Sequence, residues 1–204
     1  MNLYVIRHGE AENNIDVSVY RDTSNHEIDL TGHGILQAET AAKKLDVSLR
    51  GSAYAARAPL IFTSPYQRSK RTAQIIASRV KCSDIIVSSL LAEQNYGLAT
   101  GYESHEKYAQ KYVEQEQLLF KMGKMFSKLP QGESLADVGL RANIFLLRML
   151  HNTSVNVIVV SHLVFCSMLD CEIQGKYPSI LKWDNCEIRL YEDIGPWFKY
   201  VKHI

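Results

Sequence analysis

The stretch that decides the fold is Val155-Asn-Val-Ile-Val-Val-Ser-His162, an almost wholly apolar run that ends in a serine and a histidine. Its many β-branched residues predict a strand over 155–160 that is buried on both faces, as the strands of a parallel sheet are. Shorter apolar runs with strand character occur at residues 3–6, 60–63, 85–87 and 188–191.

Helical patterns lie between these runs. Ser64-Pro65-Tyr66-Gln67 predicts a helix start, with Ser64 as the N-cap and Pro65 at the first helical position. Further helices are expected over 102–125 and 134–150. Another apolar helix face repeats at spacings of three and four residues: Ile35, Ala38, Ala42 and Leu45. Strands that alternate with helices predict an α/β fold, a three-layer sandwich with a mainly parallel central sheet.

The composition narrows the class of protein. The chain has 204 residues, 46% of them hydrophobic and 22% charged, with a formal net charge of +1. This length and composition predict one globular domain. The balanced charge argues against nucleic acid as a partner, and no apolar run approaches the ~20 residues that span a bilayer. Arg7 and His8 interrupt any signal-type stretch at the N-terminus, so we expect a cytoplasmic protein without a membrane partner. The cysteines are expected to be thiols: Cys82, Cys166, Cys171 and Cys186.

Three predicted strands end in polar residues, at Arg7-His8, Thr63-Ser64 and Ser161-His162. Ligands of open parallel sheets bind beyond the carboxyl ends of the strands, so this edge is the expected site. Strand ends are often polar in any case, and the identities of the residues therefore have to carry the argument.

The residue types at this edge suit a phosphate. Arg68 lies in the first turn of its predicted helix, where the helix dipole disfavours a cation unless an anion is bound there too. Glu93 follows a short strand and is a candidate proton donor, although a carboxylate in a loop is commonly just solvated. With Arg7, His8 and His162, these side chains could form a phosphate site with a nitrogen nucleophile. Each histidine taken alone is more commonly structural.

Several motifs occur together and in one order along nearly the whole chain, and with them the sequence resembles the histidine phosphatase (phosphoglycerate mutase-like) superfamily. Residues 133–138, together with Glu93-Gln94, most resemble the mutase-like proteins of plants and fungi. The matching segments are Arg7-His8-Gly9-Glu10 with Asn14, then 29–34, 63–68 with Thr72-Ala73, 93–97, 131–134 and 160–162.

The resemblance implies a role for each residue of the site. His8 would be the nucleophile that becomes phosphohistidine, and His162 would stabilise the transferring phosphoryl group. Glu93 would protonate the leaving oxygen and then activate water. The phosphate would be bound by Arg7, Arg68 and Asn14. Further substrate contacts are expected from Thr23, Tyr96 and Leu163. Neither a metal nor another cofactor is implied.

Two positions depart from the family pattern. Leu163 follows the second histidine where a glycine is common, and Gln94 follows Glu93 where the glycolytic mutases usually have an arginine. Gln94 favours a phosphatase of small phosphorylated metabolites, which is the function we expect, whereas Leu163 supports the alternative of a phosphate-binding module. A phosphoglycerate mutase and a catalytically weak phosphate-binding regulatory module remain alternatives. The expected organisation is one domain over 1–204, with an insertion at about 98–130 that shapes substrate access, as a monomer or a homodimer.

Overall fold

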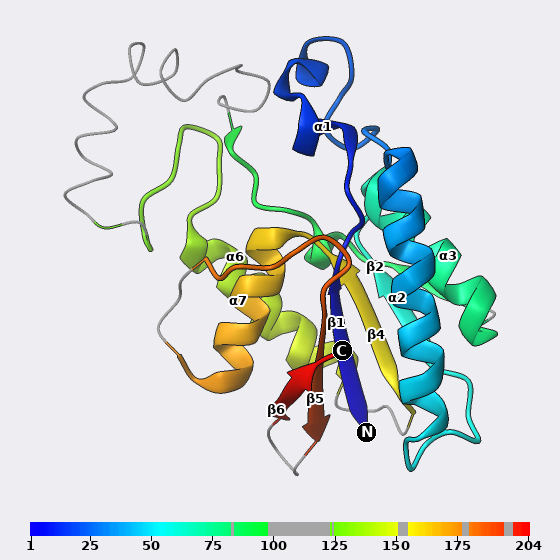
Figure 1. Cartoon of the computed structure of the whole chain (residues 1–204). Coiled ribbons are helices and arrows are strands. Elements are labelled where there is room, and N and C mark those ends of the chain that lie inside the picture. Colours follow the sequence, from blue (N-terminus) through cyan, green and yellow to red (C-terminus); the bar gives the residue numbers. More distant parts are fainter. Residues whose placement is uncertain (83, 98–122, 124, 151–154, 177–179, 194–197) are drawn as a thin grey trace.

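The strands pair into one six-stranded sheet in the order β3-β2-β4-β1-β5-β6 (Figure 1). The structure is a computed structural model that describes the chain except residues 83, 98–122, 124, 151–154, 177–179 and 194–197. The strands are β1 (Asn2–Arg7), β2 (Leu60–Thr63), β3 (Ile85–Val87), β4 (Val157–Ser161), β5 (Ile188–Asp193) and β6 (Phe198–His203). The first four are mutually parallel, and β5 and β6 complete the sheet in antiparallel pairing.

The described helices precede, connect and cover these strands. Two short ones, α1 (Glu12–Ile15) and the 3-10 helix η1 (Val17–Arg21), lie beyond the end of β1, and η2 (Ser89–Leu91) follows β3. The longer ones are α2 (Gly32–Arg50), α3 (Gln67–Val80), α6 (Leu135–Phe145) with its π-helical extension η4 (Leu146–Leu150), and α7 (Leu163–Gln174). No helix in the described part of the chain has the length and apolar character needed to cross a bilayer.

Alternation along the central strands divides the core into two clusters, one on each face of the sheet. In β1, Leu3 and Val5 pack into the cluster that contains residues of α6 and α7. Tyr4 and Ile6 pack into the cluster formed with α2 and α3. Successive side chains of a strand point to opposite faces, so a continuously apolar strand feeds both clusters. Figure 1 shows the two helix pairs on opposite sides of the sheet. The predicted three-layer α/β sandwich is confirmed.

The strand predictions are confirmed, and β6 is a strand that the sequence did not predict. The strand predicted over 155–160 begins and ends slightly later than expected, at Val157 and Ser161. β6 lies at the edge of the sheet and is largely exposed, so it lacks the continuous apolar run that marked the buried strands. No disulfide joins the four cysteines, as predicted.

One helix start was predicted wrongly. α3 begins at Gln67 with Tyr66 as its N-cap, and Ser64 does not cap it. The Ser64 hydroxyl accepts from the Tyr66 amide at 3.3 Å and lies 2.7 Å from His162 Nε2. The helix predicted over 134–150 is confirmed, with Ser134 as its N-cap. The helix predicted over 102–125 and most of the 98–130 insertion lie outside the described residues.

Candidate functional site

The two histidines are brought together by the pairing of β1 with β4. Arg7 is the register partner of Ser161, and the His8 amide donates to the Ser161 carbonyl at 2.9 Å. His8 and His162 each follow the last residue of a strand, and their ring centroids are 5.1 Å apart. Both are almost completely buried, with exposed fractions of 4% and 0%. Residues that lie far apart in the sequence thus meet at the carboxyl edge of the sheet.

The hydrogen bonds of His8 define its tautomer. Nδ1 lies 2.7 Å from the Gly9 carbonyl oxygen. A carbonyl can only accept, so the proton lies on Nδ1 and Nε2 carries the lone pair. Arg68 Nε donates to Nε2 at 3.3 Å. Burial, followed by the charges of Arg68 and Arg7, lowers the pKa of His8 well below its usual value. His8 is therefore a neutral imidazole with its nucleophilic nitrogen against a guanidinium.

Arg68 is held in place by Asn25, a loop residue that sequence reasoning did not single out. It is the second residue of α3 and is only 2% exposed. Its two terminal nitrogens donate to the Asn25 carbonyl at 2.6 Å and to Asn25 Oδ1 at 3.1 Å. The guanidinium carbon also lies 4.9 Å from the Tyr66 ring centroid. By contrast, Arg71 on the same helix is half exposed and pairs with Asp29 at the surface.

Arg7 and His162 each have a buried polar atom that finds no hydrogen-bond partner among the described residues. Arg7 donates to the Trp183 carbonyl through Nη1 at 2.6 Å, but its Nε has no partner. His162 Nε2 contacts the hydroxyls of Ser64 and Ser69, whereas its Nδ1 has none. Buried polar atoms are rarely unpaired. A guanidinium and an imidazole with capacity to spare are suited to an oxyanion.

Glu93 joins this cluster to the start of α7. Its carboxylate accepts from the amides of Gln94 at 2.9 Å, Val164 at 3.2 Å and Phe165 at 3.3 Å. Burial raises the pKa of Glu93, and these amides together with Arg68 oppose the rise. Tyr96, which is 41% exposed, also lies near this carboxyl, and burial followed by the Glu93 charge raises the pKa of Tyr96 to about 12.

The remaining predicted residues lie around this cluster. Asn14, on α1, accepts through Oδ1 from the Ala11 amide at 3.0 Å and from Asn185 Nδ2 at 3.3 Å. Leu163 is the first residue of α7 and does not have a positive φ, so replacing the common glycine causes no backbone strain. Thr23 follows η1, and its described hydrogen bond, from its amide to the Val19 carbonyl, does not reach the histidines.

Several contributors were missed by sequence reasoning. Ser64 and Tyr66 lie in the same motif as Arg68. They were missed because the start of α3 was predicted two residues too early. The others lie in connecting loops with no recognisable pattern: Asn25, Trp183 and Asn185. Among the residues described, no group of three or more His, Cys, Asp or Glu side chains is arranged to hold a metal ion.

This arrangement can be compared with known proteins. The model of the histidine phosphatase superfamily (branch 1) matches residues 3–194. The chain belongs to this superfamily. Among curated histidine phosphatase relatives, phosphoglycerate mutase-like protein AT74 of Arabidopsis thaliana is 30% identical over 176 residues, which are 78% of this chain and 53% of the relative. AT74H from the same plant is 27% identical over 212 residues, covering 93% and 73%. The chain thus spans about half of the first relative's length.

Solved structures share the histidine phosphatase fold. The α-ribazole phosphatase of Shigella flexneri superposes with a TM-score of 0.81 at 21% identity, covering 98% of this chain and 95% of that one. A phosphoserine phosphatase mutant of Entamoeba histolytica, in complex with phosphoserine, has a TM-score of 0.75 at 21% identity, covering 99% and 95%. At this identity the likeness establishes the fold alone.

Proposed function

We propose that this histidine phosphatase hydrolyses phosphomonoesters of small metabolites through a phosphohistidine on His8. The observation that carries the proposal is the state of His8. Its Nε2 is unprotonated and buried, and it faces Arg68 at 3.3 Å. A neutral nitrogen nucleophile surrounded by cationic donors is what attack on an anionic phosphate requires, because the donors offset the repulsion and the developing charge.

In the first step His8 Nε2 attacks phosphorus and forms an N–P bond while the P–O bond to the substrate breaks. Arg7, Arg68, Asn14 and His162 bind the phosphoryl oxygens. The leaving oxygen takes a proton from Glu93. In the second step Glu93 accepts a proton from water, whose oxygen attacks phosphorus and releases phosphate and free His8. Splitting hydrolysis in this way replaces one difficult displacement by two easier ones.

The same roles define the pH dependence. His8 must be neutral, and its pKa is lowered, so this requirement restricts activity only at low pH. Glu93 must be protonated for the first step, and its raised pKa extends that protonation toward neutrality. The rate of the first step therefore falls at low pH with His8 and at higher pH with Glu93, which gives a bell-shaped profile.

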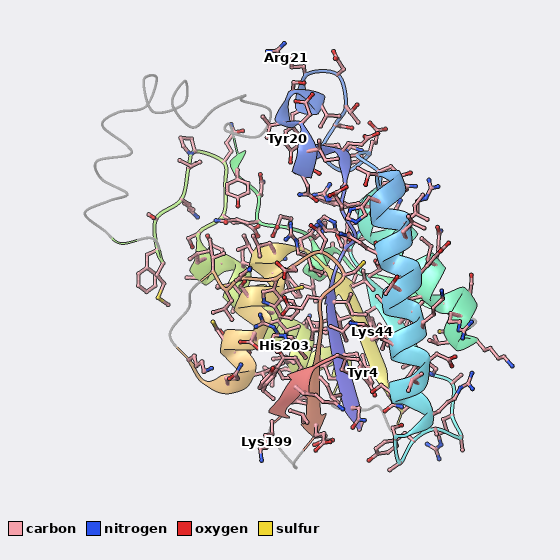
Figure 2. The ribbon with its side chains drawn as sticks, in the orientation of Figure 1. Tyr4, Tyr20, Arg21, Lys44, Lys199 and His203 are labelled. Carbon is pink, nitrogen blue, oxygen red and sulfur yellow. The ribbon has the colours of Figure 1, made fainter. Side chains whose placement is uncertain are left out.

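The direct test is phosphate release from para-nitrophenyl phosphate with excess chelator. We expect His8→Ala to retain less than about a hundredth of wild-type turnover. His203→Ala is the matched control, because His203 is an exposed histidine of β6. Figure 2 shows that strand, with His203 and Lys199, far from Tyr20, which lies beyond the carboxyl ends of β1 and β4. Equal activity of the two variants would contradict the proposal.

A second candidate is mutase chemistry, in which phosphohistidine returns its phosphoryl group to an organic substrate. The names of the Arabidopsis relatives favour testing it. Gln94 argues for hydrolysis, because its side-chain amide is neutral and cannot replace the arginine of the glycolytic mutases as a cation for a carboxylate substrate. The amide is also buried and donates to the Glu133 carbonyl at 2.8 Å. Conversion of 3- to 2-phosphoglycerate, measured against phosphate release, distinguishes the two.

We further propose a single domain over 1–204 whose 98–130 insertion shapes substrate access.

A further inference from the structure

The connector between α7 and β5 contacts the site at three points. We call residues 183–186 the connector. The Trp183 carbonyl accepts from Arg7 at 2.6 Å. The Cys186 amide lies 3.0 Å from the Arg7 carbonyl and 3.3 Å from the His8 carbonyl. Asn185 Nδ2 donates to the same His8 carbonyl at 3.0 Å. The connector thus forms hydrogen bonds with Arg7 and His8 and fixes their backbone at the end of β1.

The connector is itself fixed from β5. Arg189 Nη2 donates to the Lys182 carbonyl at 2.6 Å, and its guanidinium carbon lies 3.8 Å from the Trp183 ring centroid. Glu187 accepts from Arg189 Nε at 2.8 Å and from the Asp184 amide at 2.8 Å. The backbone of the connector is therefore fixed by charge-assisted hydrogen bonds and by the stacking of Arg189 on Trp183.

Asn185 and Asn14 have amide orientations that their neighbours determine. The His8 carbonyl can only accept, so the atom of Asn185 that contacts it is the nitrogen. The Ala11 amide can only donate, so the atom of Asn14 that contacts it is the oxygen. The contact between the two side chains then joins Asn185 Nδ2 to Asn14 Oδ1, at 3.3 Å. Oδ1 thus accepts twice, and no hydrogen bond to another described residue uses the two hydrogens of Asn14 Nδ2, which can bind a ligand.

We propose that Asn185 is a positioning residue that fixes the side-chain amide of Asn14 so that its Nδ2 hydrogens bind the substrate phosphate. This inference rests on the proposed function, because it assumes that Asn14 binds phosphate. Asn185 acts through Asn14, and its removal leaves the Asn14 amide held by the Ala11 amide alone. The consequence is a weaker grip on phosphate without the loss of any group that touches it.

The test is a double-mutant cycle with inorganic phosphate as the probe, measured by calorimetry. Asn14→Ala is expected to weaken phosphate binding about tenfold, as for loss of a hydrogen bond to a charged group. Asn185→Ala is expected to weaken it about threefold. The double variant should bind phosphate no more than about twofold more weakly than Asn14→Ala alone, because the two residues act as one unit. Losses that multiply would overturn the proposal, as would unchanged affinity in Asn185→Ala.

A matched control separates this effect from general destabilisation. Asn143→Ala removes an equivalent amide, which binds Glu172 in the last turns of α7, and it should leave phosphate affinity unchanged. A second variant, Asn185→Asp, keeps the size of the side chain but replaces the donor by an acceptor. Its loss of phosphate affinity should exceed that of Asn185→Ala, and the difference should vanish when Asn14→Ala is also present. A difference that persists there would come from charge and would contradict the proposal.

Calorimetry with phosphate needs no turnover, so the inference and the proposed function fail separately. Turnover that depends on His8 together with a multiplicative cycle would overturn the positioning role and leave the phosphatase intact. A non-additive cycle in a protein without turnover would support the positioning role and overturn the phosphatase in favour of a phosphate-binding module.

Discussion

Glu93 is subject to two influences that move its pKa in opposite directions. Burial raises the pKa, whereas the amides of Gln94, Val164 and Phe165 and the charge of Arg68 stabilise the carboxylate. A group balanced in this way can give up a proton and take it back, which is what two successive steps ask of it. The same amides fix the position of the carboxyl at the start of α7.

Glu93→Gln keeps an acceptor for those amides but removes the proton. Its effect should depend on the leaving group. We expect a loss of about a hundredfold or more in kcat/KM for an alkyl phosphate. The loss should be at least tenfold smaller for para-nitrophenyl phosphate, since its acidic phenol leaves without protonation. Steady-state kinetics on both esters measures this difference, and equal losses would remove Glu93 from the role of general acid.

At the scale of single residues, the sequence indicated where Arg68 would lie, and its role in binding phosphate stays a prediction. Arg68 stood out because a cation in a first helical turn runs against the helix dipole, and the structure buries it against His8. Asn25 and Asn185 could not be found in this way. Asn25 accepts from Arg68 and Asn185 donates to the His8 carbonyl, and only the folded chain brings these partners together. Ser64 was predicted as the N-cap of α3, and the contact of its hydroxyl with His162 was not foreseen.

At the scale of elements, α2 is pressed against the loop that carries His8. A Cβ added to Gly34 would lie 2.0 Å from the Glu10 carbonyl oxygen, and one added to Gly9 would lie 2.5 Å from the Gly34 carbonyl oxygen. Thr31, the N-cap of α2, also donates to the Glu10 carboxylate at 2.7 Å. The backbone at the start of α2 therefore packs directly against the backbone that follows β1, and this contact fixes their relative position.

Gly34→Ala should displace the loop and with it His8. We expect a loss of about 1–3 kcal/mol in the free energy of unfolding from overpacking, and a fall in kcat of about a hundredfold from misplacement of the nucleophile. Gly32→Ala is the matched control, since nothing lies within 4 Å of a Cβ at Gly32. Urea denaturation and phosphatase assays on both variants test this, and similar behaviour of the two would refute it.

At the scale of the whole molecule, stability is linked to the two buried histidines. The pKa values of His8 and His162 are both well below the usual value. The folded chain therefore binds fewer protons than the unfolded chain once the pH falls below about 6.5. The stabilising contribution of neutral histidine is complete above that pH and is lost as the pH falls. Glu93, with its raised pKa, contributes with the opposite sign.

His162→Gln isolates the histidine contribution. The free energy of unfolding of the wild type should fall more between about pH 7 and about pH 5 than that of the variant. The difference in slope should be up to about 1.4 kcal/mol per pH unit, the value for one proton. Urea denaturation at several pH values measures it. Parallel curves for the two proteins would show that His162 does not titrate abnormally.

The architecture was predictable because the pattern that encodes it is strong. A central strand as apolar as Val157–Ser161 needs helices on both faces, and the order of strands and helices then restricts the topology. β6 was missed because an edge strand buries little and carries a weak pattern. The direct pairing of β1 with β4 was not predicted, although the sequence placed both histidines at the same edge of the sheet.

The position of β1 in the middle of the sheet has a consequence for how the molecule is made. β1 is made before its neighbours in the sheet, and β4 and β5 follow it in the chain only after β2 and β3. The strand that leads to His8 therefore has no sheet partner until β4 has been synthesised. Such long-range parallel pairing is slow to form. Recovery of catalytic turnover during refolding should accordingly be among the last events, later than the appearance of helical signal.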